Sequence, residues 1–192
     1  MRKFQIVVPV LSLCFAALFY VSNIDAEVKE YKIGDPGPAG GWIFYDKGNY
    51  SDGWRYLEAS PKDLSHTAVY GCANDYSVSG NKGTDIGTGK ANTKAILKGC
   101  KKSGTGAMIC SRYRGGGKSD WFLPSKGELN EMYKNLFKKG IGDFDRNWCE
   151  VPYLSLSGGF ANSTWCQNFF YGGSQEEKAK NIGMSVRAVR EF

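Results

Sequence analysis

The pattern of apolar and polar positions separates an apolar leader from a longer region of mixed character. Arg2 and Lys3 precede an apolar run over residues 6–21, and a short, mostly polar stretch ends at Ala26. A positive start, an apolar centre and a small final residue are typical of a secretory signal peptide. We therefore expect residues 1–26 to be cleaved. The alternative is an uncleaved membrane anchor, although the run is shorter than the ~20 apolar residues that span a bilayer.

Strand-like segments occupy both ends of the region that follows the leader. They combine aromatic and β-branched residues with polar ones and are bounded by Gly, Pro, Asn and Asp. The segments are residues 41–46, 54–59, 151–157, 160–171 and 184–192. In the last segment Met184, Val186 and Val189 supply the apolar side chains, and we expect Arg187 and Arg190 to point outward.

The middle of the chain carries helix signals. A helix is predicted from residue 92 or 93 to residue 100, and Thr105 can cap a second helix that ends near residue 113. The clearest signal is Ser125 followed three positions later by Glu128, which fits a capping box. Leu129, Met132, Tyr133, Leu136 and Phe137 then recur at helical spacing up to Gly140.

The order of strands, then helices, then strands favours an α+β fold whose two ends lie close together. We expect a short Pro/Gly-rich lead over residues 27–39 and one compact domain over residues 40–192. Residues 71–90 are rich in Gly, Asn, Ser, Thr and Asp and predict a long ordered loop. Long loops without periodicity are often functional, so this loop is a further candidate.

The chain is mildly basic, with 25 basic and 19 acidic residues and a formal net charge of +6. This charge permits an anionic partner without requiring one. Basic residues gather around the first two helices: Lys98, Lys101, Lys102, Arg112, Arg114 and Lys118. Others follow the third helix: Lys126, Lys134, Lys138 and Lys139. If these faces meet, they form a patch for sulfate or phosphate oxygens. The alternative is ordinary solvated helix surface.

Catalytic and metal-binding signals are weak. His66, the only histidine, lies in a polar segment without a nucleophile motif, and we expect a solvated loop residue. Asp143 and Asp145 lie in a predicted turn, and the positions where an EF-hand needs Gly and Glu hold Trp148 and Leu154. We therefore expect no catalytic residues, no metal and no cofactor. Export and the lack of a binding motif argue against nucleic acid.

Segments of this chain that match a known protein family occur in order along nearly the whole chain after the leader. They are residues 33–35, 40–46, 54–59, 87–93, 119–125, 128–129, 165–169 and 186–190. In these the chain resembles the Lcl C-terminal domain family, the terminal module of a bacterial collagen-like adhesin. The resemblance implies a C-type-lectin-like domain with a small twisted antiparallel sheet and two to three helices. It also implies an envelope, surface or secreted setting and binding to anionic, sulfated polysaccharide.

Cysteine usage adds to this picture. Five cysteines follow the leader, and export favours their pairing, although sequence alone leaves the connectivity open. Cys166 stands where many relatives carry an aromatic residue. Because Cys149 accompanies it, we expect a Cys149–Cys166 disulfide, together with Cys100–Cys110, which leaves Cys72 unpaired. Two alternatives remain: a structural envelope protein that binds a surface protein or forms homo-oligomers, and an enzyme of the formylglycine-generating type with a reactive Cys149–Cys166 pair.

Overall fold

The structure is a computed structural model that describes residues 29–72, 83–158 and 162–192. The expected signal peptide and half of the expected 71–90 loop, residues 73–82, lie outside the described residues. No helix in these three ranges is long and apolar enough to cross a bilayer.

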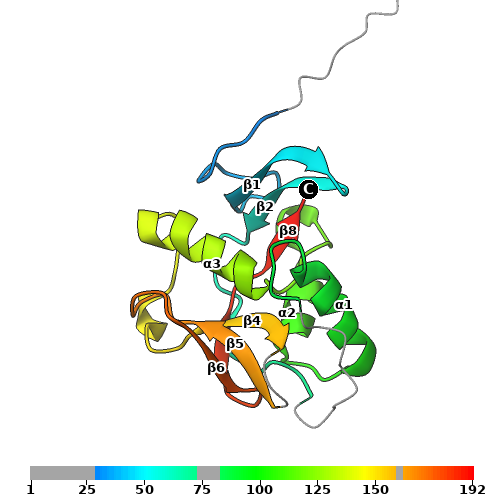
Figure 1. Cartoon of the computed structure of the whole chain (residues 1–192), viewed down its shortest axis with the longest axis vertical. Helices are drawn as coiled ribbons and strands as arrows, with labels where there is room; N and C mark the ends of the chain where they lie inside the picture. Colours follow the sequence, from blue (N-terminus) through cyan, green and yellow to red (C-terminus); the bar gives the residue numbers. More distant parts are fainter. Residues whose placement is uncertain (1–28, 73–82, 159–161) are drawn as a thin grey trace, which may run out of the picture.

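The described chain forms an α+β structure of three α-helices and eight strands in two sheets (Figure 1). The strands are β1 (Trp42–Ser51), β2 (Trp54–Ala59), β3 (Ser65–Ala68), β4 (Tyr153–Gly158), β5 (Ser163–Gln167), β6 (Gln175–Ala179), β7 (Met184–Val186) and β8 (Val189–Glu191). The α-helices are α1 (Gly89–Gly99), α2 (Gly106–Arg112) and α3 (Lys126–Asn135). Short 3₁₀ turns cover Gly115–Gly117, Phe137–Lys139 and Arg146–Trp148.

The C-terminal segment joins the two sheets. β8 pairs with β2 in an antiparallel sheet of order β1-β2-β8, whereas β7 lies between β3 and β4 in a sheet of order β3-β7-β4-β5-β6. The second sheet is mixed, because β4 and β7 run parallel. Phe192 accepts hydrogen bonds from the backbone of Tyr56 and its ring packs on Tyr31. The two ends of the domain therefore lie together, as the order of elements predicts.

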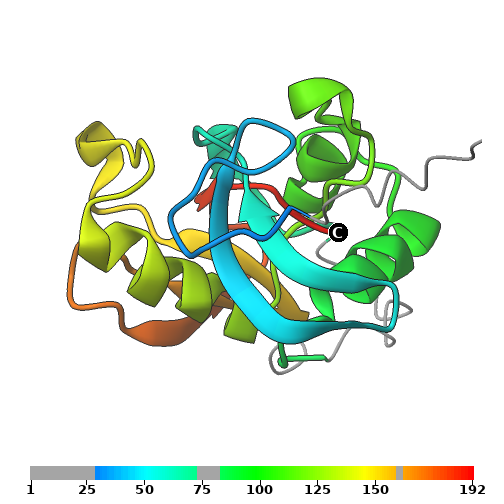
Figure 2. The ribbon, with the colours of Figure 1, turned by 90° about the horizontal axis from the view of Figure 1, so that it is seen from above.

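The helices lie on opposite sides of the β1–β2 hairpin: α3 lies on one side, and α1 and α2 lie on the other (Figure 2). The core is correspondingly divided. One apolar cluster contains Ile96 of α1 and Cys110 of α2, and the other contains Leu129 and Met132 of α3. Segment 184–192 contributes to both clusters, so it also joins the two halves of the core.

Several sequence predictions are confirmed. The strand over residues 54–59 is found with those bounds, the Thr105 side chain caps α2, and Ser125 and Glu128 form the capping box of α3. Two strands were not predicted, β3 and β6. They are the two edges of the five-stranded sheet and are largely polar or charged. Polar or charged edge strands lack the alternation that identifies a strand, and charged side chains such as those of β6 protect the open edge from pairing with other chains.

The outward placement of Arg187 is wrong. Its side chain is fully buried, donates from Nε to Asp63 Oδ1 at 2.7 Å and from Nη2 to the Asp143 carbonyl at 2.6 Å. Its guanidinium lies 3.9 Å from the centre of the Phe144 ring. The backbone beside Arg187 requires glycine at position 142, because φ there is +86° and a Cβ would lie 3.2 Å from Arg187 Nη1. A charge this deep is stable only because Asp63 compensates it.

Arg190 is also buried, contrary to the prediction. It donates to both oxygens of Asp120, at 3.0 and 2.9 Å, and to Glu58 at 3.1 Å. Glu58 in turn accepts hydrogen bonds from the backbone N–H groups of Ala39 and Gly41. The ion network therefore fixes the Pro/Gly turn that precedes β1.

Both predicted disulfides are wrong. Cys72 pairs with Cys100, whereas Cys110, Cys149 and Cys166 are free thiols. Cys110 is buried on α2. Cys100 directly follows α1 and is bonded to Cys72, the last described residue before residue 83. Burial raises the pKa of the Cys166 thiol to about 12, with the nearby Glu176 charge adding to the effect, which disfavours the nucleophilic thiolate.

The buried pair of Arg187 and Asp63 should dominate stability. We expect Asp63→Asn to lower the free energy of unfolding by about 3–5 kcal/mol, because it leaves Arg187 buried without compensation. The corresponding fall in Tm is roughly 6–20 °C, measured by calorimetry. Glu176→Gln removes an exposed ion pair with Lys178 and should cost less than about 1 kcal/mol. Equal Tm values for the two variants would contradict this assignment.

The thiols should differ sharply in reactivity. When the native protein is treated with iodoacetamide, we expect modification of the partly exposed Cys149 and protection of the buried Cys110 and Cys166. Cys72 and Cys100 should react only after reduction. Peptide mapping by mass spectrometry distinguishes these sites. Joint modification of Cys149 and Cys166 in the native protein would instead support the reactive-pair hypothesis.

Candidate functional site

A groove runs between α1 and the segment that leads to α3. Its volume is about 360 Å³, and Leu97, Trp121 and Phe122 supply its apolar floor. Four lysines line it: Lys90, Lys94, Lys98 and Lys101. The first three are spaced four residues apart, which places them on one face of α1. We call this surface, the four lysines over Leu97 and Trp121, the lysine groove.

The start of α1 is set by a carboxylate distant in sequence. Glu128 Oε1 accepts hydrogen bonds from the N–H groups of Gly87 at 2.9 Å and Gly89 at 3.2 Å, and Oε2 accepts from Ser125 at 2.8 Å. Burial raises the pKa of Glu128 to about 7, although these three N–H donors favour its ionised form. A single side chain therefore holds the N-termini of α1 and α3 together. For this reason α1 begins at Gly89, earlier than predicted.

The opposite side of α1 docks on the core. Asn92, Thr93 and Ile96 are buried, and Thr93 Oγ1 accepts a hydrogen bond from the Leu123 N–H at 3.1 Å. This contact fixes the helix beside Trp121 and Phe122. The lysine face is consequently held on a rigid element.

The groove is strongly cationic. Lys90 pairs with Glu191 at 2.8 Å, but across the described segments no carboxylate lies within ion-pair distance of Lys94, Lys98 or Lys101. Asp120 also lines the groove. Its burial opposes ionisation, yet the hydrogen bonds and charge of Arg190 lower its pKa, and the same guanidinium compensates its charge. The net field in the groove is therefore positive.

The groove contains part of the predicted basic set. Only Lys98 and Lys101 line the groove. Lys102, Arg112 and Lys118 are exposed elsewhere around α1 and α2, and Arg114 donates to the carbonyl oxygens of Ser111 and Tyr113. Sequence reasoning missed Lys90 and Lys94, although the spacing 90, 94, 98 would have revealed them once the helix began at residue 89.

The lysines near α3 do not join the groove. α3 lies on the far side of the hairpin from α1 (Figure 2). Lys134 pairs with Glu131 at 3.1 Å, and Lys126 Nζ lies 3.2 Å from the centre of the Trp165 ring. Lys138 and Lys139 are exposed after α3. The conditional prediction of one continuous patch is therefore wrong.

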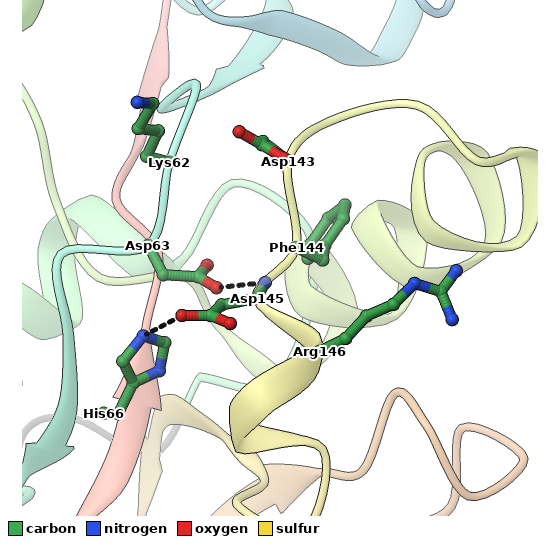
Figure 3. Close-up of a pocket in the computed structure, with 7 residues that line it drawn as sticks. All are labelled: Lys62, Asp63, His66, Asp143, Phe144, Asp145 and Arg146. Carbon is green, nitrogen blue, oxygen red and sulfur yellow. Dashed lines mark hydrogen bonds and ion pairs between the residues drawn. The ribbon is translucent and has the colours of Figure 1, made fainter.

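A second, larger cavity of about 500 Å³ contains His66 (Figure 3). The prediction of a solvated loop histidine is wrong, since His66 lies on β3 and its side chain is only 18% exposed. Its ring stacks on Trp148 with centroids 5.0 Å apart. Nδ1 lies 3.0 Å from Ser185 Oγ, and Nε2 lies 3.5 Å from a carboxylate oxygen of Asp145.

The order Ser185, His66, Asp145 resembles a hydrolytic triad, but the geometry does not support catalysis. A nucleophile must be reached by substrate, and Ser185 is 1% exposed within the sheet. Nor does any group of three or more His, Cys, Asp or Glu side chains within residues 29–72, 83–158 and 162–192 fit a metal ion. The contacts of His66 connect β3 with Ser185 of β7 and with Asp145 and Trp148.

Comparison of the sequence with models of known protein families gave no match, and comparison with curated proteins gave no relative. The resemblance described from the sequence therefore remains a hypothesis, and the case for function depends on the geometry of the lysine groove.

Glu128 should control the integrity of this site. At pH 8 we expect Glu128→Gln to lower the free energy of unfolding by about 1–3 kcal/mol, because the amide places N–H donors against backbone N–H groups. Chemical denaturation measures this change. Glu131→Gln is the matched control on the same helix, and it alters the more exposed ion pair with Lys134 and the hydrogen bond from Asn135. If the two variants unfold at the same denaturant concentration, Glu128 does not hold the start of α1.

Proposed function

We propose that this chain is an exported module of the cell envelope or surface that binds sulfated polysaccharide in the lysine groove. The observation that carries the proposal is the row Lys94, Lys98 and Lys101. These lysines border an apolar floor and, among the described residues, have no carboxylate partner. Sulfate oxygens form charge-assisted hydrogen bonds with ammonium groups. Sugar rings contribute C–H faces that suit an apolar floor.

The disulfide and the mild positive charge are consistent with this setting. Cys72–Cys100 closes the segment that leads into α1, and disulfides persist in oxidising compartments outside the cytosol. The formal charge of +6 favours encounter with a polyanion. Export also removes the chain from nucleic acid, which would otherwise compete for the same lysines.

We also propose a C-type-lectin-like fold. It is supported by the terminal strand β8, which closes the sheet of the first hairpin, and by the capped helix α3 that follows the Leu123-Pro124-Ser125 turn. A fold by itself does not identify the ligand. The alternative function is a structural envelope protein whose partner is another protein or a second copy. Exposed aromatic side chains such as Trp148 and Tyr171 favour that alternative.

The test is retention on immobilised heparin at low and moderate salt. We expect the protein to bind at low salt and Lys94/Lys98→Glu to bind about tenfold more weakly. Reversing two exposed charges should lose roughly 0.7 kcal/mol at each, which together correspond to tenfold. Lys138/Lys139→Glu is the matched control, because it changes net charge equally on the surface beside α3.

The outcomes separate the hypotheses. Weaker retention of the α1 variant alone assigns the site to the lysine groove. Equal weakening of both variants would show that heparin responds only to net charge. Absence of retention at low salt, together with a stable oligomer by light scattering, would favour the structural alternative. Retention that does not fall with salt would contradict an electrostatic site.

A further inference from the structure

A separate recess with aromatic walls lies against the three-stranded sheet. Its volume is about 330 Å³, near the lower end of the ~300–1,000 Å³ typical of ligand sites. Four aromatic side chains line it: Tyr31, Tyr50, Tyr56 and Phe192. We call it the aromatic recess. It shares no lining residue with the lysine groove.

The walls of the recess are held firmly. Tyr31, Tyr56 and Phe192 pack on one another with ring centroids 5.4 to 5.6 Å apart. The backbone of Phe192 exchanges hydrogen bonds with Tyr56, and the Tyr31 N–H donates to the Tyr56 hydroxyl at 3.2 Å. The recess is therefore already formed without a ligand.

Tyr50 is the unusual member of the set. Its side chain is 71% exposed, so its ring gains little from burial. Nevertheless its hydroxyl donates to the Gly53 carbonyl at 2.9 Å, across the β1–β2 turn. A large aromatic side chain that is exposed yet oriented by a hydrogen bond is suited to stacking against a ligand.

The aromatic rings of the recess already have cationic neighbours. Lys29 lies 4.8 Å from the Tyr31 ring centre, Arg55 lies 4.8 Å from that of Tyr56, and Arg190 lies 5.0 Å from that of Phe192. Each ring of the packed trio therefore already has a cation beside it, so a cationic ligand would compete with these side chains for the same rings.

One of these cations remains uncompensated. Arg55 is paired with two carboxylates, Asp46 at 2.8 Å and Glu30 at 3.2 Å, so its charge is more than compensated. Within the described ranges, no carboxylate lies within ion-pair distance of Lys29, which lines the recess. The recess thus combines aromatic walls with a single available positive charge.

We infer that the aromatic recess binds one pyranose ring that carries a single negative charge. The polarised C–H groups of a pyranose face stack on electron-rich tyrosine rings, with Tyr50 as the exposed platform. The anionic substituent pairs with Lys29. An uncharged aliphatic or aromatic ligand would use the walls but not the lysine, and a polysulfated chain would need several cations. This inference stands independently of the lysine groove.

The test compares two disaccharides that differ only at C6 of one ring: cellobiouronic acid, which carries a carboxylate there, and neutral cellobiose, which carries a hydroxymethyl group. Binding to the purified protein is measured by calorimetric titration and by saturation-transfer NMR. We expect the acidic disaccharide to bind severalfold more tightly than cellobiose. Tyr50→Ala should weaken its binding about tenfold, and Tyr50→Phe, which keeps the ring but loses the hydrogen bond to Gly53, should weaken it less. Lys29→Gln should abolish the preference for the acidic disaccharide.

Two controls make the result decisive. Tyr171→Ala removes another exposed tyrosine, 59% exposed, outside the recess, and should bind as the unmodified protein does. Lys94/Lys98→Glu should also leave disaccharide binding unchanged, which separates this inference from the proposed function. The inference is overturned if neither disaccharide binds at millimolar concentration. It is overturned equally if Tyr50→Ala and Tyr171→Ala behave alike, or if cellobiose binds as tightly as the acid.

Discussion

Two buried arginines in the C-terminal segment organise this molecule. Arg187 reaches Asp63 and the backbone of the 142–145 turn, and Arg190 joins Asp120 to Glu58. Since β7 and β8 belong to different sheets, these side chains connect both sheets with the turns that surround them. Desolvation makes each buried charge costly, so every partner must be present at once. The conformation of the C-terminal segment is consequently coupled to four distant parts of the chain.

The same network shapes the candidate sites. Arg190 compensates Asp120, which would otherwise place an uncancelled carboxylate in the lysine groove. It also lies beside Phe192, one wall of the aromatic recess. Arg187 fixes Asp63 and the turn that lines the His66 cavity. Charge is therefore paired inside the molecule, whereas lysines without carboxylate partners remain at the two surfaces proposed to meet anionic ligands.

The sequence predicted the features that depend on residues close to one another along the chain. The Thr105 cap, the capping box of α3 and the 54–59 strand depend on residues within a few positions of one another, and all three are confirmed. The failures depend on partners far away. Arg187 and Asp63 are 124 positions apart, and the start of α1 depends on Glu128, 39 positions beyond Gly89. The Cys72–Cys100 bond spans 28 positions. In sequence, an arginine between apolar residues is indistinguishable from an outward-facing residue of a strand. Its burial can be predicted only when its distant carboxylate partner is known.

The lysine face of α1 is energetically unfavourable on its own. Like charges four residues apart destabilise a helix by about 0.2–0.5 kcal/mol per pair, and Lys90, Lys94 and Lys98 form two such pairs. Lys90 also lies in the first turn, where the helix dipole disfavours a cation. Glu128 and Glu191 supply negative charge at that end of the helix, but in the described chain no carboxylate is paired with Lys94 or Lys98. α3 differs, since Glu131 accompanies Lys134. A polyanion in the groove would supply to α1 the negative charge that α3 provides from its own sequence.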